Sequence, residues 1–532
     1  MKYPIILSMF LFSTLSYSQL PPNPILGFGE RWTNLWSVSY DYQSNGSVRY
    51  LVQDPANSNN LCAIMMSQQD SMTPIGVNRY VYYSYSDDYG STWASNVLDV
   101  SGSQGFPSLA LQNGIPVIVT QGFSGGVFKD LQFGGFSYER ITGSPSLNYP
   151  QIIGTTNGNL VLCGSNPQTL QCGYSVYSTS WSPVINLPGI SGPSGQVSVE
   201  AGFNGNVSIF GTNYNGDKSF HWYQSSDNGL TFSEQTIFPW IVDGADTLYV
   251  NVQGGFQSVY DASGNVHVIF STFKEYKVEN KPQATGYKKS GIYHWSQQTG
   301  LNLVASNLNV PLLEDTLIQS HVSPLCHPSI GITASGRIQC AFTTYLKGFN
   351  QIVQDGSIVN AGEIFIAYSN NNGASWSTPS NITNTLFIEE KHPSLFRQAS
   401  SDSFVLYFER DMLAGNWVNV PAWGKAPVYG IWSRRVIFSD ENKNDELFSS
   451  TKNYPNPFNP TTVISYELLV GSHTKLKVFN IRGNEVATLV NKKQNAGSYS
   501  VEFNGSNYPS GVYYYKLEAE GLNEVKKMIL IK

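Results

Sequence analysis

Three neighbouring charged residues are the first candidates for chemistry. Glu409, Arg410 and Asp411 follow one another directly in the sequence. Two carboxyl groups held close together can act as the acid and the base of glycoside hydrolysis, when the surroundings keep one of them protonated. Consecutive charges are also typical of a solvent-exposed cluster of ion pairs, in which the carboxylates have no chemical role. Both interpretations stay open until the element that carries these residues is placed.

Two histidines and two aromatic residues stand in a recurring pattern. Each directly precedes a proline, which is followed by a small polar residue or Gln and then by an aliphatic residue. The four copies are Phe106-Pro107-Ser108-Leu109, Tyr149-Pro150-Gln151-Ile152, His327-Pro328-Ser329-Ile330 and His392-Pro393-Ser394-Leu395. A turn rich in Gly, Asn or Ser and a run of strand-forming residues follow each copy. We expect each copy to begin a strand with Pro at its first position, where the missing N–H falls outside the ladder.

A second pattern recurs three times and has a local chemistry. Asp or Asn accepts hydrogen bonds from backbone groups further along a turn, Gly supplies a left-handed conformation, and the closing aromatic ring packs between sheets. The pattern is Ser-x-(Asp/Asn)-x-Gly-x-(Thr/Ser)-(Trp/Phe), and its fixed positions are Ser86, Asp88, Gly90 and Trp93; Ser225, Asp227, Gly229 and Phe232; and Ser369, Asn371, Gly373 and Trp376. We interpret these residues as a structural hairpin clip and not as a catalytic site.

This second pattern resembles the Asp-box, or BNR repeat, of sialidases and related β-propellers. The resemblance implies four-stranded antiparallel blades, with degenerate copies of the turn at Tyr177–Trp181 and Trp295–Leu301. Together with the Pro-marked strand starts, the repeats give units of about 40 to 60 residues. The predicted fold class is all-β: a six- or seven-bladed β-propeller over residues 19–438, followed by a small C-terminal β-sandwich.

The resemblance also implies which face of the propeller carries the functional site. In such propellers the Asp-boxes lie on the face opposite the site, so the Pro-marked starts lie at the mouth of the central channel. The long inserts 274–289, 345–361 and 410–426 belong to the same face, and their aromatic residues suit stacking on sugars or binding a protein loop. These aromatic residues are Tyr276, Tyr287, Phe349, Trp417 and Trp423. The candidate binding residues are Phe106, Tyr149, His327, His392, Arg397, Arg410 and Asp411. The alternative for the histidines is a packed structural side chain.

The sequence lacks a motif that family sialidases use to bind and cleave their substrate. Family sialidases hold the substrate carboxylate with three arginines, one of them in a Phe/Tyr-Arg-Ile-Pro motif, and use Tyr, Glu and Asp side chains. No such motif occurs here, because Arg31 lies in Glu30-Arg31-Trp32-Thr33. We assign no catalytic residue. The leading hypothesis is a non-enzymatic propeller that binds glycan or protein at its mouth, and the alternative is a glycoside hydrolase with a diverged site. Two carboxyl groups about 5 to 9.5 Å apart at the mouth would favour the hydrolase.

Five cysteines bear on redox state and metal binding. Cys163 and Cys172 flank one predicted hairpin turn, and Cys326 and Cys340 flank another. Cross-strand disulfides are one interpretation of these pairs, and reduced, buried thiols are the other. Cys62 is left over. No CxxC pair or Cys/His cluster indicates zinc, and we predict no metal and no cofactor.

The composition and the N-terminus indicate an exported protein. Charged residues make up only 13% of the chain and the net charge is −6, which disfavours nucleic acid as a partner. Lys2, the apolar run Ile5 to Phe12 and Ser16-Tyr17-Ser18 predict a signal peptide over residues 1–18. No later run is long and apolar enough for a membrane helix. A closed ring of blades leaves no long open sheet edge, so we expect a monomer.

A separate C-terminal module follows a charged linker at 439–452. It opens with Asn453-Tyr454-Pro455-Asn456-Pro457-Phe458 and continues with alternating strand-forming runs. The residues Leu476, Val478, Phe479, Val512, Tyr514 and Leu517 are expected to supply much of its core. The opening, together with Gly483 to Val490 and Ser510 to Tyr515, resembles the C-terminal sorting domain of type IX secretion substrates, over 453–532. The resemblance implies Sec export to the periplasm, recognition by the type IX machinery, and an extracellular or outer-surface location.

Overall fold

The structure is a computed structural model in which all regular elements are β-strands. It describes residues 30–32, 48–68, 79–98, 104–122, 125–192, 197–214, 216–238, 241–243, 246–251, 254–277, 285–317, 323–383, 385, 388–399, 403–414, 428–435, 451–468, 472–481, 483–495, 497–519 and 522–532. The chain divides into two compact units, Met1–Arg435 and Val436–Lys532. None of the described residues forms a helix that could cross a membrane. The predicted signal peptide 1–18 and residues 439–450 of the predicted linker lie outside the described residues.

Seven sheets build the first unit, each around four antiparallel strands. The first three sheets consist of β2 (Leu51–Gln53), β3 (Leu61–Gln68), β4 (Arg79–Ser86) and β5 (Ala94–Val97); β6 (Gln104–Gln112), β7 (Ile115–Gly122), β8 (Gly126–Asp130) and β9 (Tyr138–Ile141); and β10 (Asn148–Gly154), β11 (Leu160–Ser165), β12 (Gln171–Tyr177) and β13 (Ile185–Ser191). The fourth sheet consists of β14 (Val197–Ala201), β15 (Val207–Thr212), β16 (Phe220–Ser225) and β17 (Ser233–Phe238).

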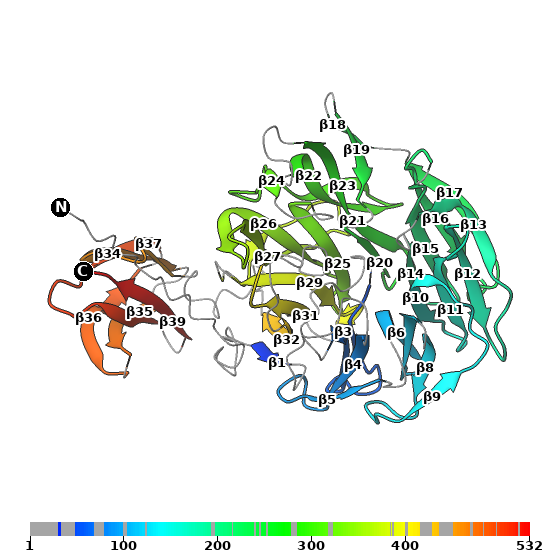
Figure 1. The fold of residues 1–532 in the computed structure, drawn as a ribbon, viewed down its shortest axis with the longest axis horizontal. Helices are drawn as coiled ribbons and strands as arrows, with labels where there is room; N and C mark the ends of the chain where they lie inside the picture. Colours follow the sequence, from blue (N-terminus) through cyan, green and yellow to red (C-terminus); the bar gives the residue numbers. More distant parts are fainter. Residues whose placement is uncertain are drawn as a thin grey trace, which may run out of the picture. The chain divides into compact units, whose positions relative to one another are not determined.

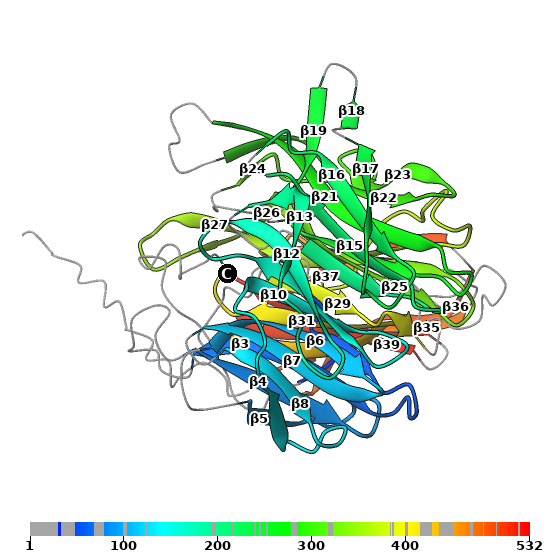
Figure 2. The same ribbon diagram turned by 90° about the vertical axis from the view of Figure 1, so that its right-hand side faces the viewer.

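The fifth and sixth sheets carry additional strands. The fifth consists of β20 (Phe256–Tyr260), β21 (Val266–Lys277), β22 (Thr285–Ser296) and β23 (Gly300–Ser306), with β18 (Ile241–Asp243), β19 (Asp246–Val250) and β24 (Thr316–Leu317) attached. The sixth consists of β25 (Leu325–Thr333), β26 (Ile338–Ile352), β27 (Ile358–Ser369) and β28 (Ser380–Asn381), with β30 (Gln398–Ala399) parallel to β25. Both views show β18 and β19 standing out at the edge of the unit (Figures 1 and 2).

The start of the chain completes the seventh sheet. This sheet contains β29 (Glu389–Leu395), β31 (Phe404–Asp411) and β32 (Val428–Arg435), and its fourth strand is β1 (Glu30–Trp32). β1 pairs antiparallel with β32, with Arg31 opposite Trp432. The described residues of the first unit therefore form seven blades, as against the six or seven expected from the repeats.

The blades pack side by side through their first strands. β6, β10, β14, β20, β25 and β29 surround a common centre, and each contacts the next (Figure 1). The first and last blades also meet, because Tyr50 N donates a hydrogen bond to Ser394 Oγ at 3.0 Å. Leu51 and Tyr407 belong to the same hydrophobic cluster across this junction. The ring of blades is thus complete.

The three Asp-containing turns share one hydrogen-bond pattern. In the first, Ser86 Oγ donates to Asp88 Oδ1 and accepts from Gly90 N, while Asp88 Oδ1 accepts from Thr92 N at 2.8 Å. The second repeats these bonds with Ser225, Asp227, Gly229 and Thr231, and the third with Ser369, Asn371, Gly373 and Ser375. Each turn joins the third and fourth strands of its blade, so the pattern fixes a hairpin.

Each of these turns also rests on the preceding blade. A Cβ atom added to Gly229 would lie 2.4 Å from Val161 Cγ2, and this glycine has φ +83°. Only glycine tolerates both the left-handed backbone and the close approach. Gly90 and Gly373 have the same backbone conformation. An added Cβ atom would lie 2.5 Å from Trp432 at Gly90 and 2.0 Å from His294 at Gly373. The closing aromatics pack on the same interfaces, since Phe232 lies 4.7 Å from Tyr174 and Trp376 lies 5.5 Å from His294 between ring centroids.

All five cysteines are buried free thiols, so the disulfide interpretation is wrong for this structure. The strand register explains the result for both pairs. Cys163 lies opposite Tyr174 and not opposite Cys172. Cys340 lies opposite Ile330, several positions along the strand from Cys326. A hairpin turn between two cysteines does not place them opposite each other. Burial raises the pKa of the Cys163, Cys326 and Cys340 thiols.

The C-terminal unit is a pair of sheets with one core. One sheet consists of β33 (Lys452–Tyr454), β34 (Thr461–Leu468) and β37 (Gly497–Asn504); the other consists of β36 (Glu485–Gln494), β35 (Ser472–Asn480), β38 (Gly511–Ala519) and β39 (Leu522–Leu530). Leu476, Val478 and Leu517 are buried as expected, but Tyr513 and Tyr515 occupy the core in place of Val512 and Tyr514. Alternate residues of a strand face opposite sides, so Tyr514 cannot share a face with Leu517. Phe479, also expected in the core, is only half-buried.

Candidate functional site at the mouth of the propeller

The four Pro-marked segments lie at one end of the ring and the Asp-containing turns at the other. The first turn lies beside the β2–β3 hairpin, because Tyr89 N donates to Asn59 O at 2.9 Å. The second turn meets the β14–β15 hairpin in the same way, through Asn228 N and Gly205 O. The Pro-marked segments stand where the first strands begin, which is the opposite end of the blade. We call this end the mouth and define it by Phe106, Tyr149, His327 and His392.

Each Pro-marked segment forms a β-bulge and not a simple strand start. Phe106, Tyr149, His327 and His392 have φ of +48°, +49°, +51° and +53°. The register of the first strand shifts at each of these points. The expectation that Pro occupies the first strand position is therefore wrong, since Pro107 is the fourth residue of β6. A bulge accommodates Pro because the extra residue makes no ladder bond.

The bulges bring the four mouth residues together as two pairs. The rings of His327 and His392 lie 4.3 Å apart between centroids, and those of Phe106 and Tyr149 lie 4.7 Å apart. Each pair joins neighbouring blades. The guanidinium of Arg79 lies 5.2 Å from the centre of the Phe106 ring. The mouth thus has a histidine pair over the sixth and seventh blades and an aromatic pair over the second and third.

A cluster of buried charges adjoins the histidine pair. Arg410 Nε donates to Glu390 Oε1 at 2.8 Å, and Lys391 Nζ lies 3.1 Å from Glu389 Oε2 and 3.8 Å from Asp411 Oδ2. Glu409, Arg410 and Asp411 are at most 2% exposed, so their interpretation as a solvent-exposed cluster is wrong. The buried charge cluster comprises Glu363, Glu389, Glu390, Lys391, Glu409, Arg410 and Asp411.

Sequence reasoning missed four members of this cluster. Glu389, Glu390 and Lys391 directly precede the His392-Pro393 bulge, and Glu363 lies on the neighbouring blade. Three consecutive charges normally indicate a surface. The informative signal was their place immediately before a Pro-marked segment, because that segment is the innermost strand of its blade.

Burial shifts the protonation of the cluster strongly. It raises the pKa of Glu390 to about 8, a rise that Arg410 opposes and Glu363 assists. Burial also raises the pKa of Glu409 well above its usual value, although Lys391 opposes the rise. Burial, followed by the charge of Lys391, lowers the pKa of His392 well below its usual value. The site therefore combines imidazole that resists protonation with buried carboxyl groups that resist ionisation.

Two buried oxygens of this site have no hydrogen-bond partner among the described residues. They are Glu409 Oε1 and Tyr407 Oη. The other oxygen of Glu409 lies 2.9 Å from His392 Nδ1. A buried polar atom without a partner is unfavourable by about 1–3 kcal/mol, so such an atom normally has a functional or ligand-binding reason.

Arg397 does not belong to the mouth, contrary to its place among the predicted binding residues. It follows the end of β29 and so lies at the Asp-turn end, where its Nε is 2.9 Å from Glu200 Oε1. Arg49 shares the same carboxylate at 3.3 Å and donates to Ser258 O and Ile330 O of two further blades. Arg49 is 4% exposed and spans the centre of the ring. These two arginines link several blades through ion pairs and hydrogen bonds, and they are not positioned to bind a ligand at the mouth.

The long inserts are only partly described. The insert at 345–361 extends β26 and β27 into a hairpin, and Tyr345 Oη donates to Glu389 Oε1 at 3.1 Å. Tyr276 and Tyr287 lie on β21 and β22, but their side chains are not among the described ones. Trp417 and Trp423 lie outside the described residues. In the described part of the chain, no group of three or more His, Cys, Asp or Glu side chains is arranged to hold a metal ion.

Residues 452–532 match the family described as Secretion system C-terminal sorting domain. The second unit is a type IX sorting domain. It indicates export across the outer membrane to the cell surface or the extracellular space, and recognition by the type IX machinery. No curated protein matches the chain.

The chain is similar in fold to several solved structures. PorZ, a surface component of the type IX secretion system of Porphyromonas gingivalis, is 13% identical with a TM-score of 0.38, over 93% of this chain and 61% of PorZ. The polysaccharide lyase Uly1 is 10% identical with a TM-score of 0.41, over 78% of this chain and 94% of the lyase. A Trypanosoma rangeli sialidase mutant is 10% identical with a TM-score of 0.35, over 95% of this chain and 89% of the sialidase. The chain thus spans about three fifths of the PorZ chain.

Proposed function

We propose that the exported propeller is a binding protein whose mouth takes up a glycan. The observation that carries the proposal is the pairing of the four mouth residues. Four non-glycine residues adopt a left-handed backbone directly before proline, and all four lie at one end of the ring. Such a backbone is unfavourable by about 1–3 kcal/mol per residue and tends to occur where function requires it.

The aromatic pair supports sugars as the ligand. Tyr149 is half-buried, so part of its ring is open to solvent, while Phe106 behind it is 8% exposed. Gln121 fixes this bulge, because its Oε1 accepts a hydrogen bond from Tyr149 N at 2.6 Å and its Nε2 donates to Asn148 Oδ1. A rigid, partly exposed aromatic ring is a suitable platform for the apolar face of a sugar ring.

Substitution of the exposed aromatic ring tests the binding function. The full-length chain and its Tyr149→Ala variant are screened on a glycan array, and hits are titrated by calorimetry. We expect binding that the substitution weakens at least tenfold. Tyr177→Ala is the matched control, because it removes the same ring from the same blade at the Asp-turn end. Equal losses in both variants, or glycan binding that Tyr149→Ala leaves intact, would refute the proposal.

We also propose that the sorting domain alone commits the propeller to the type IX route. A chain ending at Arg435 retains the complete first unit. We expect it to accumulate in the periplasm of a bacterium with type IX machinery, whereas the full chain reaches the surface or the medium. Cell fractionation measures the difference. Surface exposure of the shortened chain would contradict this proposal without bearing on glycan binding.

A glycoside hydrolase is the second candidate, and the buried charge cluster favours it. Glu409 has a raised pKa and an oxygen without a partner, and Lys391 lies between the carboxyl groups of Glu389 and Asp411. A protonated carboxyl beside an ionised one is the arrangement that general acid catalysis needs. Against it, Glu389, Glu409 and Asp411 are at most 2% exposed.

A panel of fluorogenic glycosides, including a sialoside, separates the two candidates. Under the hydrolase hypothesis the full chain releases the fluorophore and Glu409→Gln lowers kcat at least a hundredfold, because general acid catalysis contributes about 10²–10⁴-fold. Under the binding hypothesis neither the full chain nor Glu409→Gln turns over any glycoside.

A further inference from the structure

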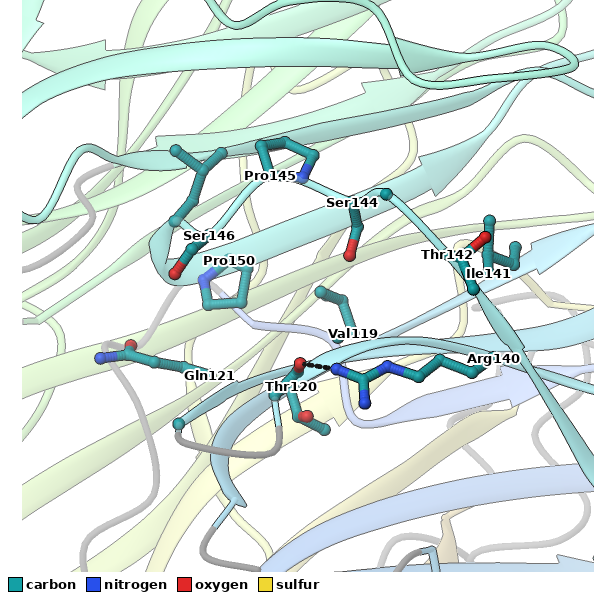
Figure 3. A pocket seen from close by; sticks show the side chains of 15 residues that line it. Val119, Thr120, Gln121, Arg140, Ile141, Thr142, Ser144, Pro145, Ser146 and Pro150 are labelled. Carbon is teal, nitrogen blue, oxygen red and sulfur yellow. Dashed lines mark hydrogen bonds between the residues drawn. The ribbon is translucent and has the colours of Figure 1, made fainter.

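A second site lies outside the mouth residues, between the second and third blades. The cavity there has a volume of about 340 Å³. Its walls come from the end of β7, the start of β8, the end of β9 and the connection 142–147 that leads to Pro150 (Figure 3). Ligand pockets commonly have volumes of about 300–1,000 Å³. The size therefore suits a single sugar residue with accompanying water, and exceeds what an inorganic anion needs.

Arg140, an exposed residue, provides a positive charge at this cavity. Its Nη2 donates to Gly125 O at 2.6 Å, and its guanidinium carbon lies 5.7 Å from the centre of the Phe128 ring. A Cβ atom on Gly126 would lie 2.9 Å from Arg140 Nε, so glycine at this position lets the guanidinium lie flat on the strand. Among the described residues no carboxylate pairs with Arg140. A guanidinium held in this way offers its remaining N–H groups to a planar carboxylate.

Hydroxyl groups surround the rest of the cavity. The side chains of Thr142, Ser144 and Ser146 line it and form no hydrogen bond with any described protein group. Ser144 and Arg140 enter the cavity from opposite sides in Figure 3. Free hydroxyls that face a cavity are suited to the hydroxyl groups of a sugar, as donors and as acceptors.

Apolar groups complete the lining and the cavity is formed in advance. Pro145 and Pro150 present rigid rings, and the buried Val119 and Ile141 form part of the wall. Gln121 also lines the cavity. Its Oε1 accepts a hydrogen bond from Tyr149 N and its Nε2 donates one to Asn148 Oδ1, both in the third blade. A wall that is already ordered loses little entropy on binding. The combination of one cation, free hydroxyls and small apolar faces matches an acidic sugar.

We propose that this pocket binds the terminal uronic acid of an extracellular saccharide, with the sugar carboxylate on Arg140. The pocket adjoins the Tyr149 bulge through Gln121 and Pro150 but contains none of the four mouth residues. Arg140 makes no hydrogen bond or ion pair with any of these four described residues, so substitutions at Arg140 and at the histidine pair test the two proposals separately. Binding to this pocket is expected to persist in the mouth variant His392→Ala.

Titration of the full-length chain with single sugars tests the assignment. D-glucuronate and D-glucose differ at C6 only, and saturation-transfer NMR follows both up to about 20 mM. A single sugar of this size is expected to bind with a Kd of about 1 mM. We expect saturable binding of glucuronate and at least tenfold weaker binding of glucose. No saturation by glucuronate, or equal affinity for glucose, would overturn the proposal.

Two variants and a second anion sharpen the test. Arg140→Gln is expected to weaken glucuronate binding about tenfold, the loss typical of one charged hydrogen-bonding group. Lys218→Gln, an equal charge change at an exposed residue of the fourth blade, is expected to change nothing. Ser144→Trp should fill the cavity and abolish binding while Arg140 remains. Unchanged binding in Arg140→Gln or Ser144→Trp contradicts the site, and tighter binding of glucose 6-sulfate than of glucuronate contradicts the carboxylate assignment.

Discussion

The imidazole rings of His327 and His392 lie 4.3 Å apart at an angle of 42°, each in a left-handed residue before proline. They occupy the same position in successive blades, so the repeat itself creates the contact. Burial lowers the pKa of both, and for His327 the charge of His392 contributes further. Both rings are therefore neutral in the folded protein over the physiological range.

Acid is expected to destabilise the propeller through these histidines. The unfolded chain takes up protons below the usual pKa of 6.5 while the folded rings do not, so stability falls as the pH drops below about 6.5. The limiting slope is about 1.4 kcal/mol per pH unit for each histidine. Glu390 acts in the opposite direction, because its raised pKa stabilises the folded state at low pH and this contribution is lost as the pH rises toward 8.

Urea unfolding at pH 6.5 and 5.5 isolates the histidine contribution. All tryptophans precede residue 433, so their fluorescence reports the propeller alone. The free energy of unfolding of His327→Gln should depend less steeply on pH than that of the wild type, by up to about 1.4 kcal/mol per unit. Asp88→Ala, which removes stability but no histidine, should keep the wild-type slope. Identical slopes in wild type and His327→Gln would contradict the assignment.

The Asp-containing turns predict a contrast between two substitutions at one position. Asp88→Ala removes the acceptor of Thr92 N and should lower the free energy of unfolding by about 1–2 kcal/mol. Asp88→Asn should lower it by less than about 0.5 kcal/mol. The third turn already carries Asn371, whose Oδ1 accepts from Ser375 N and whose Nδ2 donates to Ser375 Oγ. Chemical denaturation measures both, and equal losses would show that the charge matters more than the hydrogen bonds.

Substitutions of glycine can separate backbone conformation from close packing. Gly229→Ala imposes a left-handed alanine and a clash with Val161, and is expected to lower the free energy of unfolding by about 2–4 kcal/mol. Gly336 has φ +85° with nothing within 4 Å of an added Cβ atom, so Gly336→Ala should lower it by only about 1 kcal/mol. Thermal or urea unfolding gives the comparison. Similar losses for both would mean that the Asp turn does not press on the neighbouring blade.

The three-membered cluster Arg49–Glu200–Arg397 predicts unequal effects of substituting its carboxylate and its outer arginine. Burial lowers the pKa of Arg49 to about 10, and Glu200 opposes this effect. Glu200→Gln leaves the 4%-exposed Arg49 without its carboxylate and should lower the free energy of unfolding by about 3–5 kcal/mol. Arg397→Gln leaves the Arg49–Glu200 pair in place and removes only the second arginine on Glu200, whose side chain is 20% exposed, so it should lower the free energy of unfolding by less than half as much. Equal effects of the two substitutions would contradict a central role for Arg49.

Sequence patterns predicted the blades better than they predicted the site. The Asp-type turns and the Pro-marked segments recur because each blade repeats one hairpin arrangement, and they marked six of the seven blades. The fifth blade has a first strand, Phe256–Tyr260, without proline, so only its degenerate turn at Trp295–Leu301 indicated it. The pairing of β1 with β32 had no local signal, because it depends on where the ring closes.

Within the site, the residue types were predictable and their surroundings were not. The x-Pro pattern found His327 and His392, yet a left-handed residue before proline goes against local preference and only the packed ring enforces it. Arg397 lies only five positions after His392, but the strand β29 between them carries it to the other end of the channel. Burial of Glu389 and Glu390 depends on contacts between blades that no single strand reveals.

The pairing of Arg31 with Trp432 has a consequence for biogenesis. The seventh sheet is completed by β1, which precedes the other described strands in the sequence, so the ring of blades cannot close until β32, at the end of the first unit, has been synthesised. Until then β1 lacks its partner strand, and an unpaired strand edge is able to pair with a foreign strand. The sorting domain begins at Lys452, soon after this seam. Closure of the ring therefore depends on contact between two segments about 400 residues apart in the sequence, and a chain shortened before β32 would leave β1 without its partner.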